Sequence, residues 1–217
     1  MRVILVPVAD RPECVYALRT SFSLARHLGS DVVGCHVRAH RNEAVELGDR
    51  RRWLSRSLQQ TEWPLIDESV SETQTQSALA LFERIAAEYE YPRSKKPGTR
   101  ETPHALWKEK VGTPPYVIPI IGPASDMVVV SRPRADGGEK ARILLMQALM
   151  GSHRPVLVLP QEEHQIRAKR IAIGWNRGSH EARTLHAVMP ILKQAEEVVF
   201  MTIGKSNKLG PRAADMI

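Results

Sequence analysis

The chain has 217 residues, of which 42% are hydrophobic and 25% are charged, and its formal net charge is +7 at pH 7. This composition is typical of a globular protein with one large domain or one and a half ordinary ones. No apolar run approaches the ~18 residues of a membrane-spanning helix, and the N-terminus has no secretory signal, so we expect a cytoplasmic protein with no membrane partner.

The cysteines and the basic residues point to no metal and to no specific nucleic acid. Cys14 and Cys35 lack metal-ligand spacing and a disulfide would be unusual here, so we expect both to be buried or half-buried free thiols. The positive charge allows weak attraction to polyanions. The densest basic cluster, Arg50 to Arg52 beside Trp53, could contact RNA, but a solvated helix face with one packed aromatic is the favoured interpretation.

The chain opens with a pattern that predicts a parallel β-α-β unit. Val3 to Val8 is a continuous apolar run of strand length, as expected for a strand covered on both faces. A helix should begin at Pro12, with Asp10 or Arg11 as its cap, and stop at Gly29. A second apolar run, Val32 to Val37, follows it. In one sheet this order implies parallel strands and a right-handed crossover.

The following segments complete an α/β domain. In chain order we expect a helix at 43–58, an amphipathic helix at 77–88, a loop at 91–98, a half-exposed edge strand at 104–110, a short helix at 112–121, a buried strand at 127–130, a helix at 141–150 and a buried strand at 154–160. Strands that alternate with helices predict one open, doubly wound five-stranded parallel sheet over residues 1–160.

After a polar linker at 161–168 the chain starts again in the same order. A strand at 170–176, a helix at 181–194 and a strand at 198–203 echo the opening β-α-β unit, which indicates a tandem duplication. Two strands alone are marginally stable and leave an unpaired edge. We therefore expect residues 169–217 to be part of a second domain, either truncated or completed by another chain.

Several segments resemble universal stress proteins, the UspA family. They are Ile4 to Val8 with the Pro12-Glu13 helix start, Ser23 to Gly29, Ser125 to Val130, Arg154 to Pro160, and Ile171 to Asn176 with Gly178 to Ala182. The resemblance implies a Rossmann-like sheet of order 3-2-1-4-5, of the adenine nucleotide alpha hydrolase-like type. It also implies a role in stress resistance and pairing through the fifth strand, so we expect a homo-oligomer, a dimer, or contact with a second such domain.

The candidate ligand site lies at the carboxyl ends of the strands, as in other open parallel sheets. Family members that bind ATP use an acidic residue after the first strand and a Gly-x2-Gly-x9-Gly-Ser/Thr loop after the fourth. Here Ser131 and Arg134 replace the first two glycines, and Gly151-Ser152 comes too late. The acidic position falls on Ala9, with Asp10 one step on. The resemblance therefore supports the fold more strongly than it supports the ligand.

Two functional hypotheses follow. The first is a non-catalytic stress-response protein with a degenerate nucleotide site, which acts through protein contacts or a weakly bound ligand. The alternative is an ATP- or AMP-binding regulatory module in which Arg132 and Arg134 supply charge in place of the glycine loop. Asp10 would then reach the ribose and Val37 would pack on the base, although Asp10 is also explained as a helix cap. The cofactor stays open between ATP and none.

An enzyme is the third class, and the sequence gives it no support. It has no Gly-x4-Gly-Lys-Ser/Thr loop and no Gly-x-Ser-x-Gly elbow. His36 is the one candidate base, but a packed histidine whose ring meets a loop carbonyl is favoured. Cys35 cannot form a dyad with it, because adjacent strand residues face opposite sides.

Overall fold

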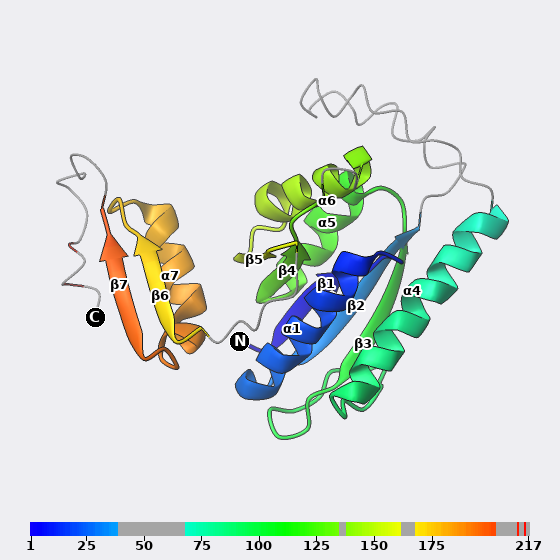
Figure 1. Ribbon diagram of the computed structural model, residues 1–217, viewed down its shortest axis with the longest axis horizontal. Helices are drawn as coiled ribbons and strands as arrows, with labels where there is room; N and C mark the ends of the chain where they lie inside the picture. Colours follow the sequence, from blue (N-terminus) through cyan, green and yellow to red (C-terminus); the bar gives the residue numbers. More distant parts are fainter. Residues whose placement is uncertain (39–67, 135–137, 162–167, 203–211, 213–214, 216–217) are drawn as a thin grey trace. The chain divides into compact units, whose positions relative to one another are not determined.

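The computed structural model describes residues 1–38, 68–134, 138–161, 168–202, 212 and 215. They fall into two compact units, unit 1 (Met1–His164) and unit 2 (Gln165–Ile217) (Figure 1). The predicted helix at 43–58, the basic cluster at 50–52 and most of the predicted linker lie outside the described residues. None of the described helices combines the length and the apolar character needed to cross a membrane.

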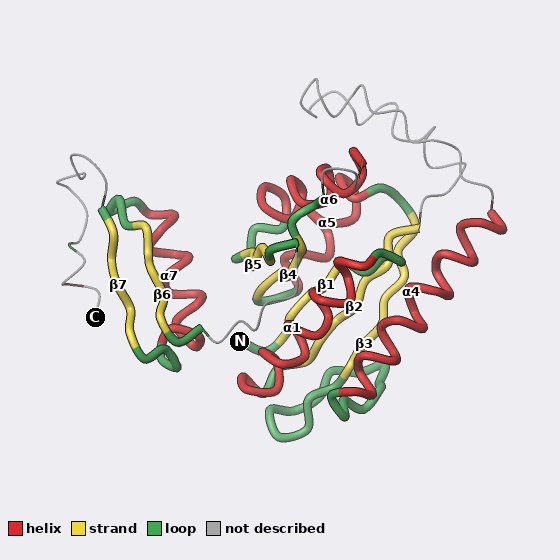
Figure 2. Tube along the Cα trace, viewed as in Figure 1, coloured by secondary structure: helices red, strands yellow, loops and turns green. Residues whose placement is uncertain are grey.

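Unit 1 is built from parallel strands that alternate with helices (Figure 2). Its strands are β1 (Val3–Pro7), β2 (Asp31–Arg38), β3 (Ala105–Val111), β4 (Met127–Ser131) and β5 (Val156–Leu159). Its helices are α1 (Pro12–Leu28), α4 (Glu68–Glu88), α5 (Pro114–Ile121), the 3-10 helix η2 (Gly122–Ala124) and α6 (Gly138–Gly151). The sheet order is β3-β2-β1-β4-β5, which confirms the predicted fold class.

Helix α1 begins and ends at backbone signals that the sequence contains. Pro12 lies in its first turn, so the N-cap falls on Arg11, whose side chain makes no capping hydrogen bond. Of the two predicted cap residues, Arg11 is confirmed and Asp10 is wrong. Gly29 closes the helix at φ 58°, in the left-handed region that glycine tolerates. A Cβ at Gly29 would also lie 2.7 Å from the carbonyl oxygen of Arg100.

Helices cover both faces of the sheet. On one face, the ring of Phe82 from α4 packs between Phe22 of α1 and Trp107 of β3, with centroid distances of 5.7 and 5.4 Å. Gly34 of β2 allows this approach, because a Cβ there would lie 2.6 Å from the Phe82 ring. On the other face α5 and α6 pack together near β4 (Figure 1), and Ala148 of α6 joins the apolar side chains of the central strands.

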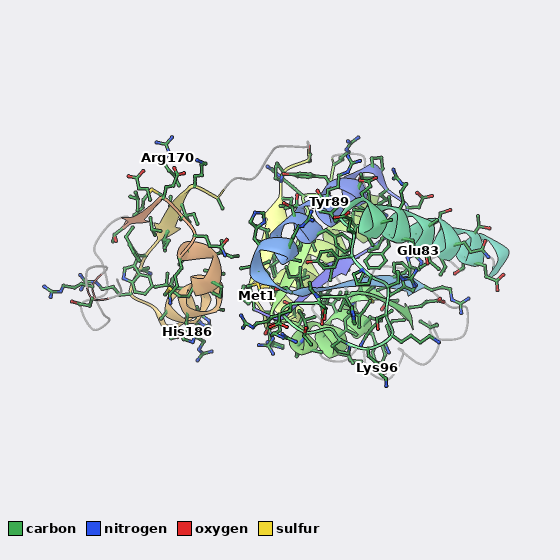
Figure 3. All side chains as sticks on the ribbon, turned by 90° about the horizontal axis from the view of Figure 1, so that it is seen from below. Met1, Glu83, Tyr89, Lys96, Arg170 and His186 are labelled. Carbon is green, nitrogen blue, oxygen red and sulfur yellow. The ribbon has the colours of Figure 1, made fainter. Side chains whose placement is uncertain are left out.

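Helix α4 begins earlier than the apolar pattern predicts. Its second half buries Leu81, Phe82 and Ile85, as expected from the predicted helix at 77–88. Its first half is polar and carries Ser71 and Gln74. In Figure 3 the exposed side chain of Glu83 lies at the surface of unit 1. The polar first half has no apolar stripe, so amphipathicity alone could not detect it.

Strand β5 is not the buried strand that its apolar sequence predicts. Among the described strands it pairs only with β4, so it lies at the edge of the sheet. Val158 is 39% exposed, Val156 and Leu157 are half-buried, and only Leu159 is buried. An apolar run is typical of a strand that is paired with a strand on each side and covered on both faces. In the part of the sheet that the structure describes, β5 is paired with one strand, β4.

Unit 2 is a single β-α-β unit. Its elements are β6 (Arg170–Gly174), α7 (Ser179–Leu192) and β7 (Glu197–Met201), and the two strands are parallel. Helix α7 packs through Leu185 and Leu192 against Trp175, which directly follows β6, and these three buried side chains form the core of the unit. Trp175 N donates to Met201 O at 2.8 Å, just as Val8 N donates to Cys35 O in unit 1. The predicted elements are present, whereas duplication and truncation stay predictions.

Candidate functional site

A cleft of about 320 Å³ opens at the carboxyl ends of β1, β2 and β4 in unit 1. Its walls come from the end of β1, the first turns of α1, the end of β2, the polar half of α4, the residues around Gly112 before α5, and α6. This is the edge where parallel α/β sheets bind ligands. The volume is at the small end of the roughly 300–1,000 Å³ of small-molecule sites.

Three of the five predicted site residues line this cleft. Asp10, Val37 and Ser131 are in its walls, whereas Arg132 and Arg134 are exposed and are not among the lining residues. The structure therefore brings together Asp10 and Val37, the candidates for the nucleoside, with Ser131 of the phosphate-loop position, and leaves the two arginines outside. The role of each residue toward a ligand stays a prediction.

The start of the loop after β4 is hydrogen-bonded to α1 on one side and to the end of β5 and Gln161 on the other. The Ser131 hydroxyl donates to the carbonyl of Glu13 in α1 at 2.8 Å. The Gln161 side-chain amide donates to the carbonyl of Pro133 at 2.6 Å, and Arg132 N donates to Leu159 O at 2.8 Å. The groups at the start of this loop are thus engaged in contacts with α1 and with the end of β5.

His36 is held by its surroundings. Its ring is buried, Nδ1 lies 2.9 Å from the carbonyl oxygen of Val8, and the ring stacks on Trp107 with an interplanar angle of 10°. The packed-histidine interpretation is therefore confirmed. A carbonyl can only accept, so Nδ1 carries the proton, and in the neutral ring Nε2 is an acceptor. His36 is one of the residues that line the cleft.

Arg38, the last residue of β2, is a cleft residue that the sequence interpretation missed. Its Nε lies 3.0 Å from Oε1 of Glu109, but the N–H is not aligned for a hydrogen bond. The side chain is half-buried, and its backbone carbonyl accepts a hydrogen bond from Gly112 N at 2.8 Å. Its position directly after the predicted strand Val32 to Val37 is the signal that could have identified it.

Both thiols border the cleft and both are held protonated. Burial raises the pKa of Cys14 to about 11 and that of Cys35 to about 12, with Lys110 and Lys108 opposing the shift at Cys35. A thiol reacts as its thiolate, so these cysteines are poor nucleophiles at neutral pH. Both are free, as predicted. The described residues contain no group of three or more potential metal ligands of the His, Cys, Asp and Glu types.

The fold and the cleft define unit 1 as a Rossmann-like α/β module with a cleft at the carboxyl edge of its sheet. No protein-family model matches the sequence, and no curated protein matches it either. Similar solved structures include the universal stress protein UspA from Lactobacillus plantarum, with 12% identity, a TM-score of 0.48 and coverage of 73% of this chain and 97% of that one.

Two further similar structures have a nucleotide in the crystal. One is the universal stress protein from Archaeoglobus fulgidus in complex with dAMP, with 13% identity, a TM-score of 0.44 and coverage of 73% of this chain and 96% of that one. The other is a universal stress protein in complex with cAMP, with 10% identity, a TM-score of 0.44 and coverage of 74% and 98%. All three are universal stress proteins, the family that the sequence motifs resemble.

Proposed function

We propose that unit 1 is a non-catalytic binding module of the universal stress protein type, with a degenerate nucleotide site whose cleft holds a small ligand weakly. The bonding of the β4–α6 loop carries this proposal. Phosphate cradles work through free backbone N–H groups and a helix N-terminus. Here Ser131 is bonded to α1, Arg132 N is bonded to Leu159, and the Arg132 and Arg134 side chains lie outside the cleft lining.

The side chains around the cleft support binding without chemistry. A nucleophile needs an adjacent base or a lowered pKa. The thiols of Cys14 and Cys35 have raised pKa values, and the Nδ1 of His36 is bonded to a carbonyl. Among the described lining residues, no hydrogen bond joins a nucleophile to a base. Bound ligand would then act by stabilising the module and its protein contacts.

Calorimetry with ATP, AMP and adenosine, using the full chain, tests this proposal. The Ser131 hydroxyl and Arg132 N, at the described start of the β4–α6 loop, are already bonded within the protein. We therefore expect the β- and γ-phosphates to add little affinity, so that the Kd values of ATP and AMP lie within about threefold of each other, a difference of roughly 0.7 kcal/mol. Phosphate release from ATP would contradict the non-catalytic role. A Kd for ATP at least tenfold below that for AMP would favour the alternative ATP-binding module. In that case Arg134→Ala should remove the preference for ATP, and the control Arg142→Ala should keep it.

We further propose that copies of the chain associate through β5. Val158 on this edge strand and Met146, Leu149 and Met150 on α6 are exposed large apolar side chains. Exposed apolar side chains and unpaired strand edges mark sites of protein association. The occupant of this surface would be a second copy or a second domain of the same type.

A further inference from the structure

We propose that the cleft binds a small organic oxyanion, a carboxylate or phosphate on a hydroxylated body, with its anionic group at Arg38 at the end of β2 rather than at the β4–α6 loop. This inference rests on the proposed binding function of unit 1. It specifies the chemical class of the ligand and its orientation in the cleft.

The guanidinium of Arg38 has an N–H group that is not hydrogen-bonded in the described part of the chain. It carries five N–H groups and no acceptor, in a planar fork that matches carboxylate and phosphate. Glu109 is its ion-pair partner, yet the Nε–H is buried without an aligned acceptor in the described part of the chain. A buried donor without an acceptor is costly. An incoming oxyanion can take up the donors that Glu109 leaves unused.

Polar side chains line the cleft together with Arg38. Ser71 and Gln74, from the polar half of α4, line the same cleft and bring a hydroxyl and an amide. In the parallel pairing of β2 with β3, Glu109 lies opposite His36, two residues from Arg38 on the same face of the sheet, so Glu109 is the acidic group nearest to this guanidinium among the described pairs.

The α1 side of the cleft has the opposite character. Asp10 and Glu13 line it, with Arg11 between them in sequence. Their carboxylates accept hydrogen bonds from hydroxyl or ammonium groups and repel phosphate. A ligand with an oxyanion at one end and hydroxyls along its body matches this distribution of donors and acceptors.

Calorimetry with ribose 5-phosphate, gluconate and neutral ribose tests the inference on the full chain. We expect at least one of the two anions to bind at least tenfold more tightly than ribose, and the preferred anion identifies phosphate or carboxylate as the group at Arg38. Arg38→Gln should weaken the binding of that anion, raising its Kd about ten- to hundredfold, as expected for the loss of a charge-assisted hydrogen bond. Arg142→Gln, an exposed arginine on α6 outside the lining, should change nothing.

A second variant keeps the test independent of folding damage. Glu109→Gln removes the competing carboxylate without touching the cleft lining, so the anion affinity should rise about three- to tenfold, since charge-assisted hydrogen bonds are roughly twice as strong as neutral ones. The inference is overturned if neither anion binds more tightly than ribose, or if Arg38→Gln and Glu109→Gln both leave the affinity unchanged.

A cavity-filling variant separates this inference from the proposed function. Ala141 of α6 lines the cleft, so Ala141→Trp should block any ligand that binds there. If Ala141→Trp abolishes anion binding and Arg38→Gln does not, the binding function stands and the role of Arg38 is wrong. If Ala141→Trp leaves binding unchanged, the ligand lies elsewhere, and both proposals are contradicted.

Discussion

The hydrogen bond from Ser131 to Glu13 ties the β4–α6 loop to α1, and its removal should lower stability without creating a phosphate site. The donor and acceptor are 2.8 Å apart, and the bond is partly buried. A neutral hydrogen bond of this kind contributes about 0.5–1.5 kcal/mol net. Ser131→Ala should therefore lower the free energy of unfolding by about 1 kcal/mol, and Ser131→Gly by up to about 2 kcal/mol, because glycine adds backbone entropy to the unfolded chain.

Urea unfolding followed by circular dichroism measures this effect. The free energy of unfolding falls with urea concentration by roughly 1–3 kcal/mol/M, so Ser131→Ala should lower the urea midpoint by about 0.3–1 M. Ser23→Ala is a matched control, since the hydroxyl of Ser23 makes none of the described hydrogen bonds. An unchanged midpoint in Ser131→Ala would refute the bond. Tighter ATP binding by Ser131→Gly would refute the argument that this loop is not a phosphate cradle.

Three other consequences can be measured. Gly34→Ala should destabilise unit 1 by about 1–3 kcal/mol through overpacking against Phe82, seen as a lower melting temperature, and Phe82→Leu in the same chain should restore part of the loss. Burial raises the pKa of Cys35 from 9.0 to about 12, so the folded state binds more protons than the unfolded state between these values. The protonated thiol of Cys35 therefore makes its full contribution to the free energy of unfolding below pH 9, and this contribution should decrease as the pH rises toward 12. The urea midpoint should be lower at pH 10 than at pH 8, and Cys35→Ala should make this difference smaller. Val158→Lys should reduce the apparent mass in sedimentation equilibrium if copies pair through β5, and an unchanged mass would contradict that pairing.

The fold was predictable because its signals are local. The runs Val3 to Val8 and Val32 to Val37 are apolar on both faces, and Gly29 supplies the left-handed residue that ends α1. Each of these features is determined by residues that are close together in the sequence. The start of α4 and the exposure of Val158 on β5 depend instead on which elements pack against them, so the apolar pattern gave the wrong boundary for one and the wrong burial for the other.

The site was predictable in position but not in detail. The ends of parallel strands locate the cleft from topology alone, and Asp10, Val37 and Ser131 do line it. The contact between Ser131 and Glu13 joins residues that are 118 positions apart, and no local pattern encodes it. Arg38 was overlooked because the family motif directs attention to the loop after the fourth strand.

The ratio of the Kd values of AMP and ATP for the full chain, measured by calorimetry in the same buffer, tests the central claim most directly. If the β4–α6 loop is not a phosphate cradle, the two nucleotides should bind within about threefold of each other, and Arg134→Ala should leave both values unchanged. A tenfold or greater preference for ATP that Arg134→Ala removes would contradict the account.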